Sequence, residues 1–232
     1  MNQAIFLDAL QQTVISCRKC PRLVRWREKI AREKVKRFQE WDYWGKPVPS
    51  FGDPNARLLI VGLAPAAHGA NRTGRMFTSD RSGSLLYPTL HKFGFANQPI
   101  SFTRGDGLKL KDCYITAVVR CAPPQNKPTP KELQNCRPYF LEELRLLKSI
   151  RVIVGLGKVS FDAIFRGLKE LQMTSLKNKP AFGHGVVVPI APNLSLIGSY
   201  HPSQQNTFTG KLTPAMFESI FRKAKNLLNQ VI

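Results

Sequence analysis

The stretch GLAPAAHGANRTGRMFTSD, residues 62–80, combines groups that could do chemistry with residues that leave room for a ligand. Its carboxylate, Asp80, and its imidazole, His68, can accept or donate protons. Small residues limit side-chain bulk, so that a flat ligand could lie against the backbone. These small residues are Gly62, Ala64, Ala66, Gly69 and Ala70. A structural role is also open, because Asp80 could cap the turn that follows it.

Two later stretches carry further polar groups. RCAPPQNKPTP, residues 120–130, contains Asn126, whose amide offers both a donor and an acceptor. SYHPSQQNTFTG, residues 199–210, contains His201, whose imidazole could donate to a developing negative charge. Asn126 could instead be an ordinary turn residue between prolines, and His201 could be a capped loop residue.

Four of the five cysteines could form one site. Cys17 and Cys20 are a CxxC pair, whereas Cys121 and Cys136 lie about a hundred residues later. Cys113 begins the β-rich run CYITAVV and would stand about 26 Å from Cys121 along a strand, so it is excluded. Zinc and an iron–sulfur cluster both accept four thiolates, and the spacing hardly separates them. Unrelated buried thiols, or a redox-active CxxC pair, are the simpler alternatives.

The charge is strongly positive. Lys and Arg number 35 against 15 Asp and Glu, which gives a net charge of +20. Such an unbalanced cationic surface favours a polyanionic partner, most often nucleic acid. The densest segment, RKCPRLVRWREKIAREKVKR at 18–37, has apolar residues at helical spacing. Its basic side chains could contact phosphates, or they could be a solvated helix face.

The elements that must position these groups alternate in type. Apolar runs predict strands at 57–62, 113–119, 151–157 and 194–199, and residues 185–190 could form a hairpin with the last strand. Helices are expected from the capping box at 129–132, over 159–168 and over 214–228. This alternation predicts a three-layer α/β/α sandwich around a central, mostly parallel four-stranded sheet.

In such a sheet, ligands bind at the carboxyl ends of the strands. All three polar stretches follow predicted strands, so we expect them to meet in one cleft. Residues 96–112 are expected to form an exposed loop.

The remaining features concern size and compartment. The 232 residues suit one domain, to which the basic helical segment is an N-terminal extension. No stretch approaches the roughly 18 apolar residues of a membrane helix, and the first residues, with Asp8, do not resemble a signal peptide. We expect a cytoplasmic, nucleoid-associated monomer with no membrane partner.

The three stretches, in this order, and the cysteine pattern resemble the uracil-DNA glycosylase superfamily, most closely its type B (fifth) family. The resemblance runs from Cys17 to about residue 220. It implies an enzyme that flips uracil out of DNA and hydrolyses its N-glycosidic bond. Other deaminated bases such as hypoxanthine are expected substrates too. The resemblance also implies a [4Fe–4S] cluster on Cys17, Cys20, Cys121 and Cys136, structural in role, which ties the basic helix to the second loop.

Individual roles follow from the resemblance. Phe77 stacks on the flipped base, Asn126 binds its edge, and His201 donates to the uracil oxygen. Where many relatives carry a polar residue two positions after the first glycine, this chain has Ala64, as the type B family does. Asp80 is therefore our candidate for the catalytic carboxylate, with His68 and Asn126 as competitors.

Further residues are expected around the substrate. Ala66 and His68 are expected to line the base pocket. The residues expected to contact DNA are Arg72, Arg75, Gln204, Gln205 and Asn206. Phe208, in the same loop, could fill the gap left by the base.

Two other classes of protein could share some of these features. An iron–sulfur DNA-binding module without hydrolytic activity would explain the charge and the cysteines, but it gives Asp80, Asn126 and His201 no shared purpose. A zinc nucleobase deaminase needs an H-x-E signature. No histidine of this chain has Glu two positions later, so the deaminase is excluded.

Overall fold

A computed structural model describes residues 3–230 of the chain. Its centre is a six-stranded sheet with the order β1-β3-β2-β4-β6-β5. The four inner strands are parallel to one another. They are β2 (Leu58–Gly62), β3 (Cys113–Ala117), β4 (Val152–Leu156) and β6 (Leu194–Ser199). All four were predicted from their apolar runs.

The predicted count of four strands is wrong, because an antiparallel strand closes each edge. β5 (Val187–Ala191) pairs with β6, as the proposed hairpin required. β1 (Phe51–Gly52) pairs with β3 and was not predicted. Two residues are too few to show an alternating pattern, so β1 left no signal in the sequence.

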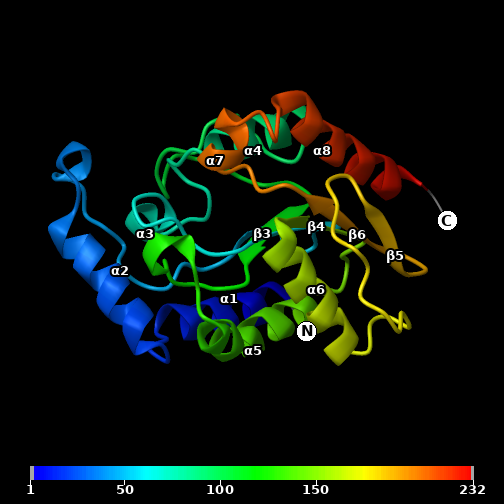
Figure 1. The fold of residues 1–232 in the computed structure, drawn as a ribbon, viewed down its shortest axis with the longest axis horizontal. Coiled ribbons are helices and arrows are strands. Elements are labelled where there is room, and N and C mark those ends of the chain that lie inside the picture. Colours follow the sequence, from blue (N-terminus) through cyan, green and yellow to red (C-terminus); the bar gives the residue numbers. More distant parts are fainter. Residues whose placement is uncertain (1–2, 231–232) are drawn as a thin grey trace.

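Helices cover both faces of the sheet (Figure 1), as the three-layer prediction required. α4 (Gly83–Lys92) and α8 (Pro214–Asn229) pack on one face. α1 (Gln3–Ile15), α5 (Pro130–Leu146) and α6 (Lys158–Glu170) pack on the other. Successive strand side chains point to opposite faces, so each of the four parallel strands contributes to both cores.

The basic helix is shorter than the 18–37 segment suggested. α2 spans Pro21–Glu33, with proline in the first helical turn, where its missing N–H costs nothing. A 3₁₀ turn, η1 (Lys36–Phe38), follows. α2 lies at one side of the molecule (Figure 1), and its Leu23 packs against Val119 and Cys121 in a small third core.

Three short helical segments follow the strands that end at the predicted cleft. α3 (Ala70–Thr73) follows β2, η2 (Pro124–Asn126) follows β3, and α7 (Gln204–Phe208) follows β6. The predicted capping box of α5 is confirmed: the Thr129 side chain accepts from the Glu132 backbone, and Glu132 accepts from Thr129.

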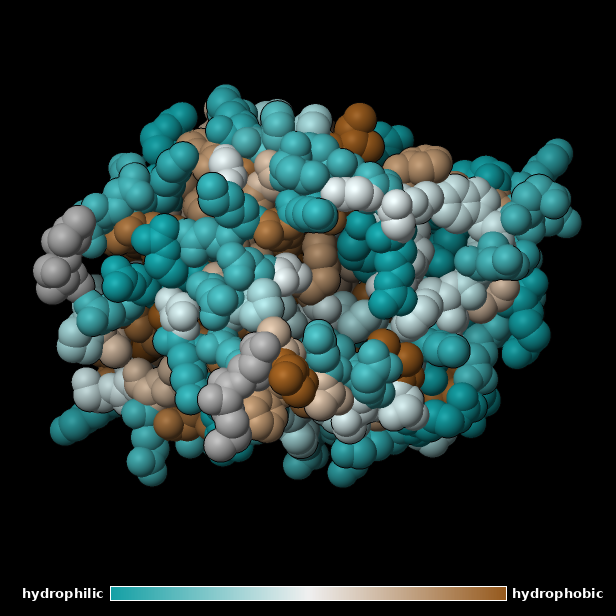
Figure 2. Space-filling model, turned by 180° about the vertical axis from the view of Figure 1, so that it is seen from behind, coloured by the Kyte–Doolittle hydropathy of each residue, from teal (hydrophilic) through white to brown (hydrophobic). Residues whose placement is uncertain are grey.

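The surface is polar. Hydrophilic side chains cover most of the face in Figure 2, and hydrophobic ones appear there as separate small patches. Among residues 3–230, no helix has the length and apolar content that crossing a membrane requires.

Candidate active site

The three polar loops meet in a cleft of about 580 Å³ at the carboxyl ends of the parallel strands. Four predicted residues from three separate loops line it together: Phe77, Asp80, Asn126 and His201. Ala66, Gln204 and Gln205 line it as well. The predicted convergence of the loops is therefore confirmed. Two basic residues at this cleft, Arg81 and Lys127, were missed, because isolated cations in loops carry no distinctive pattern.

Asp80 sits where the cleft meets the first turn of α4. Its Oδ1 accepts from the Gly83 backbone N–H at 2.7 Å, so the interpretation of Asp80 as a cap is confirmed. A Cβ added at Gly69 would lie 2.6 Å from Oδ2, so the glycine makes room for the carboxylate. Burial raises the pKa of Asp80 to about 6, although backbone N–H bonds and the charge of Arg72 oppose the shift.

Phe77 is fitted onto the end of β2 by two glycines. A Cβ at Gly62 would lie 2.8 Å from the Phe77 ring, and one at Gly83 would lie 1.7 Å from its carbonyl oxygen. Phe77 itself has a φ of 55°, in the left-handed region that non-glycine residues rarely adopt. Its ring therefore reaches the cleft only because two neighbouring positions lack side chains.

Backbone strain concentrates around the cleft. Between residues 3 and 230, seven non-glycine residues have positive φ. Four of them line the cleft or lie beside it: Phe77, Ser79, Gln125 and Asn126. Such conformations cost about 1–3 kcal/mol each and cluster at sites where function requires a fixed geometry. Two of these residues, Gln125 and Asn126, are consecutive in η2, and both line the cleft.

His201 follows β6 and faces Phe77. The two ring centroids lie 6.2 Å apart, with 40° between the ring planes. The Asn206 side chain donates to the His201 carbonyl at 2.9 Å and so fixes this turn. Burial lowers the pKa of His201 to about 4, so at neutral pH the ring is uncharged and keeps one N–H to donate.

Three expected contact residues do not face the cleft. Arg72 is 1% exposed, and its guanidinium lies over the rings of Phe38 and Trp41 at 3.8 and 4.0 Å. The His68 ring is 3.1 Å from the Tyr43 hydroxyl and does not line the cleft. The side-chain amide of Asn206 donates a hydrogen bond to the His201 carbonyl. Burial therefore corrects the expected contact of Arg72 with DNA, and His68 is corrected as a residue of the base pocket, whereas the DNA contact of Asn206 stays a prediction.

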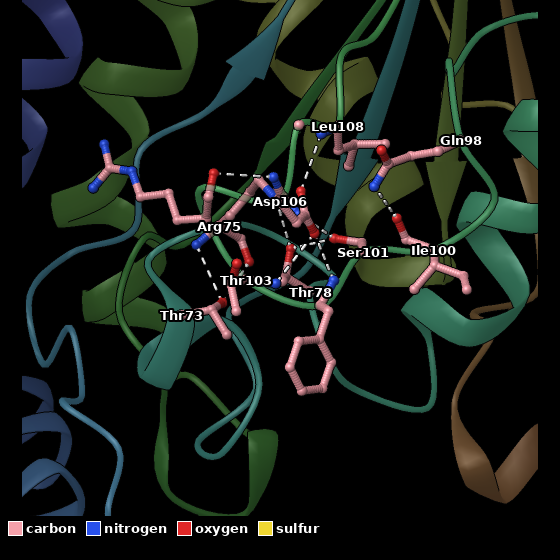
Figure 3. A network of polar contacts seen from close by, with 12 residues as sticks. Thr73, Arg75, Thr78, Gln98, Ile100, Ser101, Thr103, Asp106 and Leu108 are labelled. Atoms are coloured by element: carbon pink, nitrogen blue, oxygen red, sulfur yellow. Dashed lines mark hydrogen bonds and ion pairs between the residues drawn. The ribbon is translucent and has the colours of Figure 1, made fainter.

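Arg75 is corrected in the same way. It is 5% exposed and forms an ion pair with Asp106 at 2.7 Å (Figure 3). It also donates to Thr78 and Ser101. Burial alone would raise the pKa of Asp106, but this ion pair and backbone N–H bonds lower it to about 2. Arg75 therefore anchors the loop that contains Asp106, and its charge is not available to DNA.

The cysteines form a second site beside the cleft. One cavity is lined by Cys17, Cys20, Cys121 and Cys136, from the start of α2 and from the segment after β3. Cys113 is buried in β3, away from this cavity, as predicted. Within residues 3–230, no three His, Cys, Asp or Glu side chains stand in the arrangement of a single-ion site.

Three nitrogen donors point at these sulfurs. Arg27, which is 2% exposed, donates to Cys121 Sγ at 2.9 Å. The Arg120 backbone donates to Cys136 Sγ at 3.3 Å, and Asn135 to Cys20 Sγ at 3.5 Å. Burial raises the pKa of Cys121 to about 11 and that of Cys136 to about 12, and the bonds from Arg27 and Arg120 oppose this shift because they stabilise negative charge on sulfur.

Comparisons with known proteins agree with this geometry. A family model described as the uracil DNA glycosylase superfamily matches residues 49–225. A type-5 uracil-DNA glycosylase of Mycobacterium tuberculosis is 52% identical over 94% of this chain and 80% of the relative. One from Thermus thermophilus is 48% identical over 95% of this chain and 97% of the relative. A type-4 uracil-DNA glycosylase of Pyrobaculum aerophilum is 28% identical over 85% and 83%, respectively.

The first two relatives cover nearly the whole chain. The chain therefore belongs to the type-5 family of the uracil-DNA glycosylase superfamily.

Proposed function

We infer that this protein excises uracil from DNA by hydrolysing the N-glycosidic bond, leaving an abasic site. One observation carries the inference: an aromatic ring, a carboxylate, an amide and a neutral imidazole from three loops line one cleft. A flipped nucleotide requires these groups together, because its base must be stacked, bound at its edge and released as an anion.

In the proposed mechanism, Asp80 acts on the positive charge that develops on the sugar, and His201 acts on the negative charge that develops on the leaving base. As the bond breaks, the sugar becomes oxocarbenium-like and the base leaves as an anion. The Asp80 carboxylate stabilises the sugar or orients the attacking water. His201, neutral because its pKa is about 4, donates an N–H to the uracil oxygen as negative charge grows there. Ala64 offers no polar group, which leaves Asp80 as the only carboxylate among the described cleft residues.

Phe77 and Asn126 are proposed to hold the base. The ring stacks on it, and the amide pairs with its donor and acceptor edge. Ala64 and Ala66 add little bulk to the same wall. The pocket is therefore proposed to admit other deaminated bases, including hypoxanthine, besides uracil.

The test is base release from a uracil-containing oligonucleotide, followed by alkaline strand scission. Asp80→Ala is expected to lower single-turnover excision by at least a hundredfold, while DNA affinity stays close to wild type and the melting temperature falls by only a few degrees with the lost bond to Gly83. Asp8→Ala removes an exposed carboxylate on α1 and should change nothing. Wild-type excision by Asp80→Ala would remove Asp80 from the mechanism. Absence of release by the wild-type protein would favour a binding module without catalytic activity.

We further propose that Cys17, Cys20, Cys121 and Cys136 hold a [4Fe–4S] cluster. The support is the donor set itself: four thiols arranged around a cavity, with three N–H donors aimed at the sulfurs. The cluster would supply cross-links, not redox chemistry, because its ligands join α2 to the second cleft loop. The buried guanidinium of Arg27 would balance its negative charge.

Cys17→Ser tests the cluster. The purified wild-type protein should contain iron and sulfide and be brown, and the variant should lose the colour and its visible absorbance, thermal stability and DNA binding together. Cys113→Ala is the matched control and should keep the absorbance, because Cys113 lies in β3. A colourless Cys17→Ser protein with wild-type melting temperature would contradict the structural role.

We propose that the protein acts as a monomer on the nucleoid in the cytoplasm.

Gln204 and Gln205 are exposed at the mouth of the cleft, and Phe208 is 67% exposed on the same short helix. They are proposed to contact the strand that carries the everted nucleotide.

A further inference from the structure

The loop at 97–108 displays two bare apolar side chains next to the cleft. Ile100 is 67% exposed and Phe102 is 56% exposed. Ser101, which lies between them in the sequence, makes two contacts with the loop at 62–80. Its carbonyl accepts from the Ser79 N–H at 2.9 Å, and its hydroxyl oxygen lies 2.7 Å from that of Thr78. The exposed pair is therefore held directly beside the segment that carries Phe77 and Asp80.

This exposure belongs to a fixed loop. Asp106 accepts from the backbone N–H groups of Phe102, Thr103 and Leu108 at 2.7–3.1 Å, and it pairs with buried Arg75 (Figure 3). Gln98 donates to the Ile100 carbonyl at 2.8 Å. The edge of the Phe102 ring packs against Trp41, with centroids 5.5 Å apart. A loop braced in this way presents its apolar tip rigidly instead of folding it inward.

The surroundings match DNA in charge. Exposed Arg104 stacks on Trp44 at 4.5 Å, and exposed Arg81 lies over the exposed Phe208 ring at 5.5 Å. Exposed cations on the Asp80 loop and on the loop at 97–108 thus lie against aromatic side chains. This arrangement suits a duplex, whose phosphates attract cations while its base steps accept apolar wedges.

We propose that Ile100 and Phe102 form a DNA wedge that inserts at a base step beside the everted nucleotide. It would act from the Asp80 side of the cleft, separately from the loop that follows β6. Unstacking energy is largest for a paired base and smallest for a mismatched or single-stranded one. The wedge should therefore raise the excision rate most for a paired uracil in duplex DNA, and least for a single-stranded one. This proposal rests on the glycosylase activity inferred above.

The test is single-turnover excision by an Ile100→Ala/Phe102→Ala double variant at saturating enzyme. We expect at least a tenfold loss on uracil paired with adenine, a smaller loss on uracil opposite guanine, and less than a twofold loss on single-stranded DNA. Ile100→Leu/Phe102→Leu should restore most of the activity, because apolar bulk suffices for insertion. The melting temperature should fall only slightly, through the lost contact between Phe102 and Trp41, since both side chains are largely exposed.

A matched control is available on α1, where Ile5 and Phe6 are 64% and 45% exposed. Ile5→Ala/Phe6→Ala should leave all three rates unchanged. Wild-type rates in the Ile100/Phe102 variant would overturn the proposal, as would equal losses on all substrates, which would indicate damage to the cleft. A change in self-association with unchanged excision would assign the patch to a second copy of this chain. If even the wild-type protein released no uracil, the glycosylase function itself would be wrong.

Discussion

Asp80 should set the acid limit of activity, because its pKa is raised to about 6 by burial. If the carboxylate is the active form, excision needs Asp80 deprotonated. The single-turnover rate should then be flat above pH 7 and fall towards tenfold per pH unit below about pH 6. His201, with a pKa of about 4, stays neutral throughout this range. Asp80→Asn should give a low rate without this acid limb, and a flat wild-type profile from pH 5 to 8 would contradict the assignment.

The sequence motifs located Asp80, Asn126 and His201 in one cleft, because each follows a strand that ends at the same sheet edge. They could not reveal that Arg75 is buried, because its partner Asp106 lies 31 positions away in a loop without a recognisable pattern. The burial of Arg72 could not be predicted for the same reason, because the Phe38 and Trp41 rings that cover it come from a different segment of the chain. A cation in a functional loop looks identical in sequence whether it faces solvent or an aromatic ring.

Among the elements, α5 is tied to the sheet by a buried polar network around Glu143. This carboxylate is fully buried and pairs with Arg120, and it accepts from Gln11 at 2.8 Å and from Thr116 at 2.6 Å. Glu143→Ala would leave the buried Arg120 guanidinium without its counter-charge. We expect a loss of about 3–5 kcal/mol in the free energy of unfolding. The melting temperature should fall by about 10 °C.

The neighbouring Glu142 is the natural control. It is only partly buried and pairs with Arg145 at 3.3 Å on the surface of α5. Glu142→Ala should cost less than about 1 kcal/mol, because exposed ion pairs contribute little. Equal stability of the two variants in thermal unfolding would show that the buried pair does not anchor α5.

The four parallel strands were predictable because each is a run of apolar residues buried on both faces. The end of α2 was not, since basic residues continue past Glu33 at helical spacing, while Lys34 adopts a φ of 51° that ends the helix. Charge patterning alone does not encode such a stop. Tertiary contacts between Trp41, Arg72 and the residues around them determine the path of the chain there.

At the scale of the whole molecule, the net charge of +20 should make DNA binding strongly salt-dependent. If α2 lies along the DNA, its exposed Arg25 neutralises a phosphate and releases a counterion. Arg25→Ala should then weaken binding for every sequence and reduce the slope of log K against log salt by about 0.9. Binding titrations over a range of NaCl concentrations measure this slope.

Arg222, exposed on α8, provides the comparison. Arg222→Ala removes the same charge from a helix on the face of the sheet opposite α5, so its slope should stay that of the wild type. If the two variants lowered the slope equally, the effect would come from net charge, and α2 would have no special contact with DNA.

The first two helices depend on partners that are made much later. Gln11 on α1 donates to Glu143, 132 positions further on, and Arg22 on α2 donates to Glu132, 110 positions further on. At about 5–20 residues per second, translation reaches those partners only several seconds after the helices are made. During that interval the most cationic part of the chain emerges beside ribosomal RNA with no site to occupy. In a nascent chain whose synthesis stopped before residue 132, α2 would lack its partner Glu132 and would stay exposed beside the ribosome.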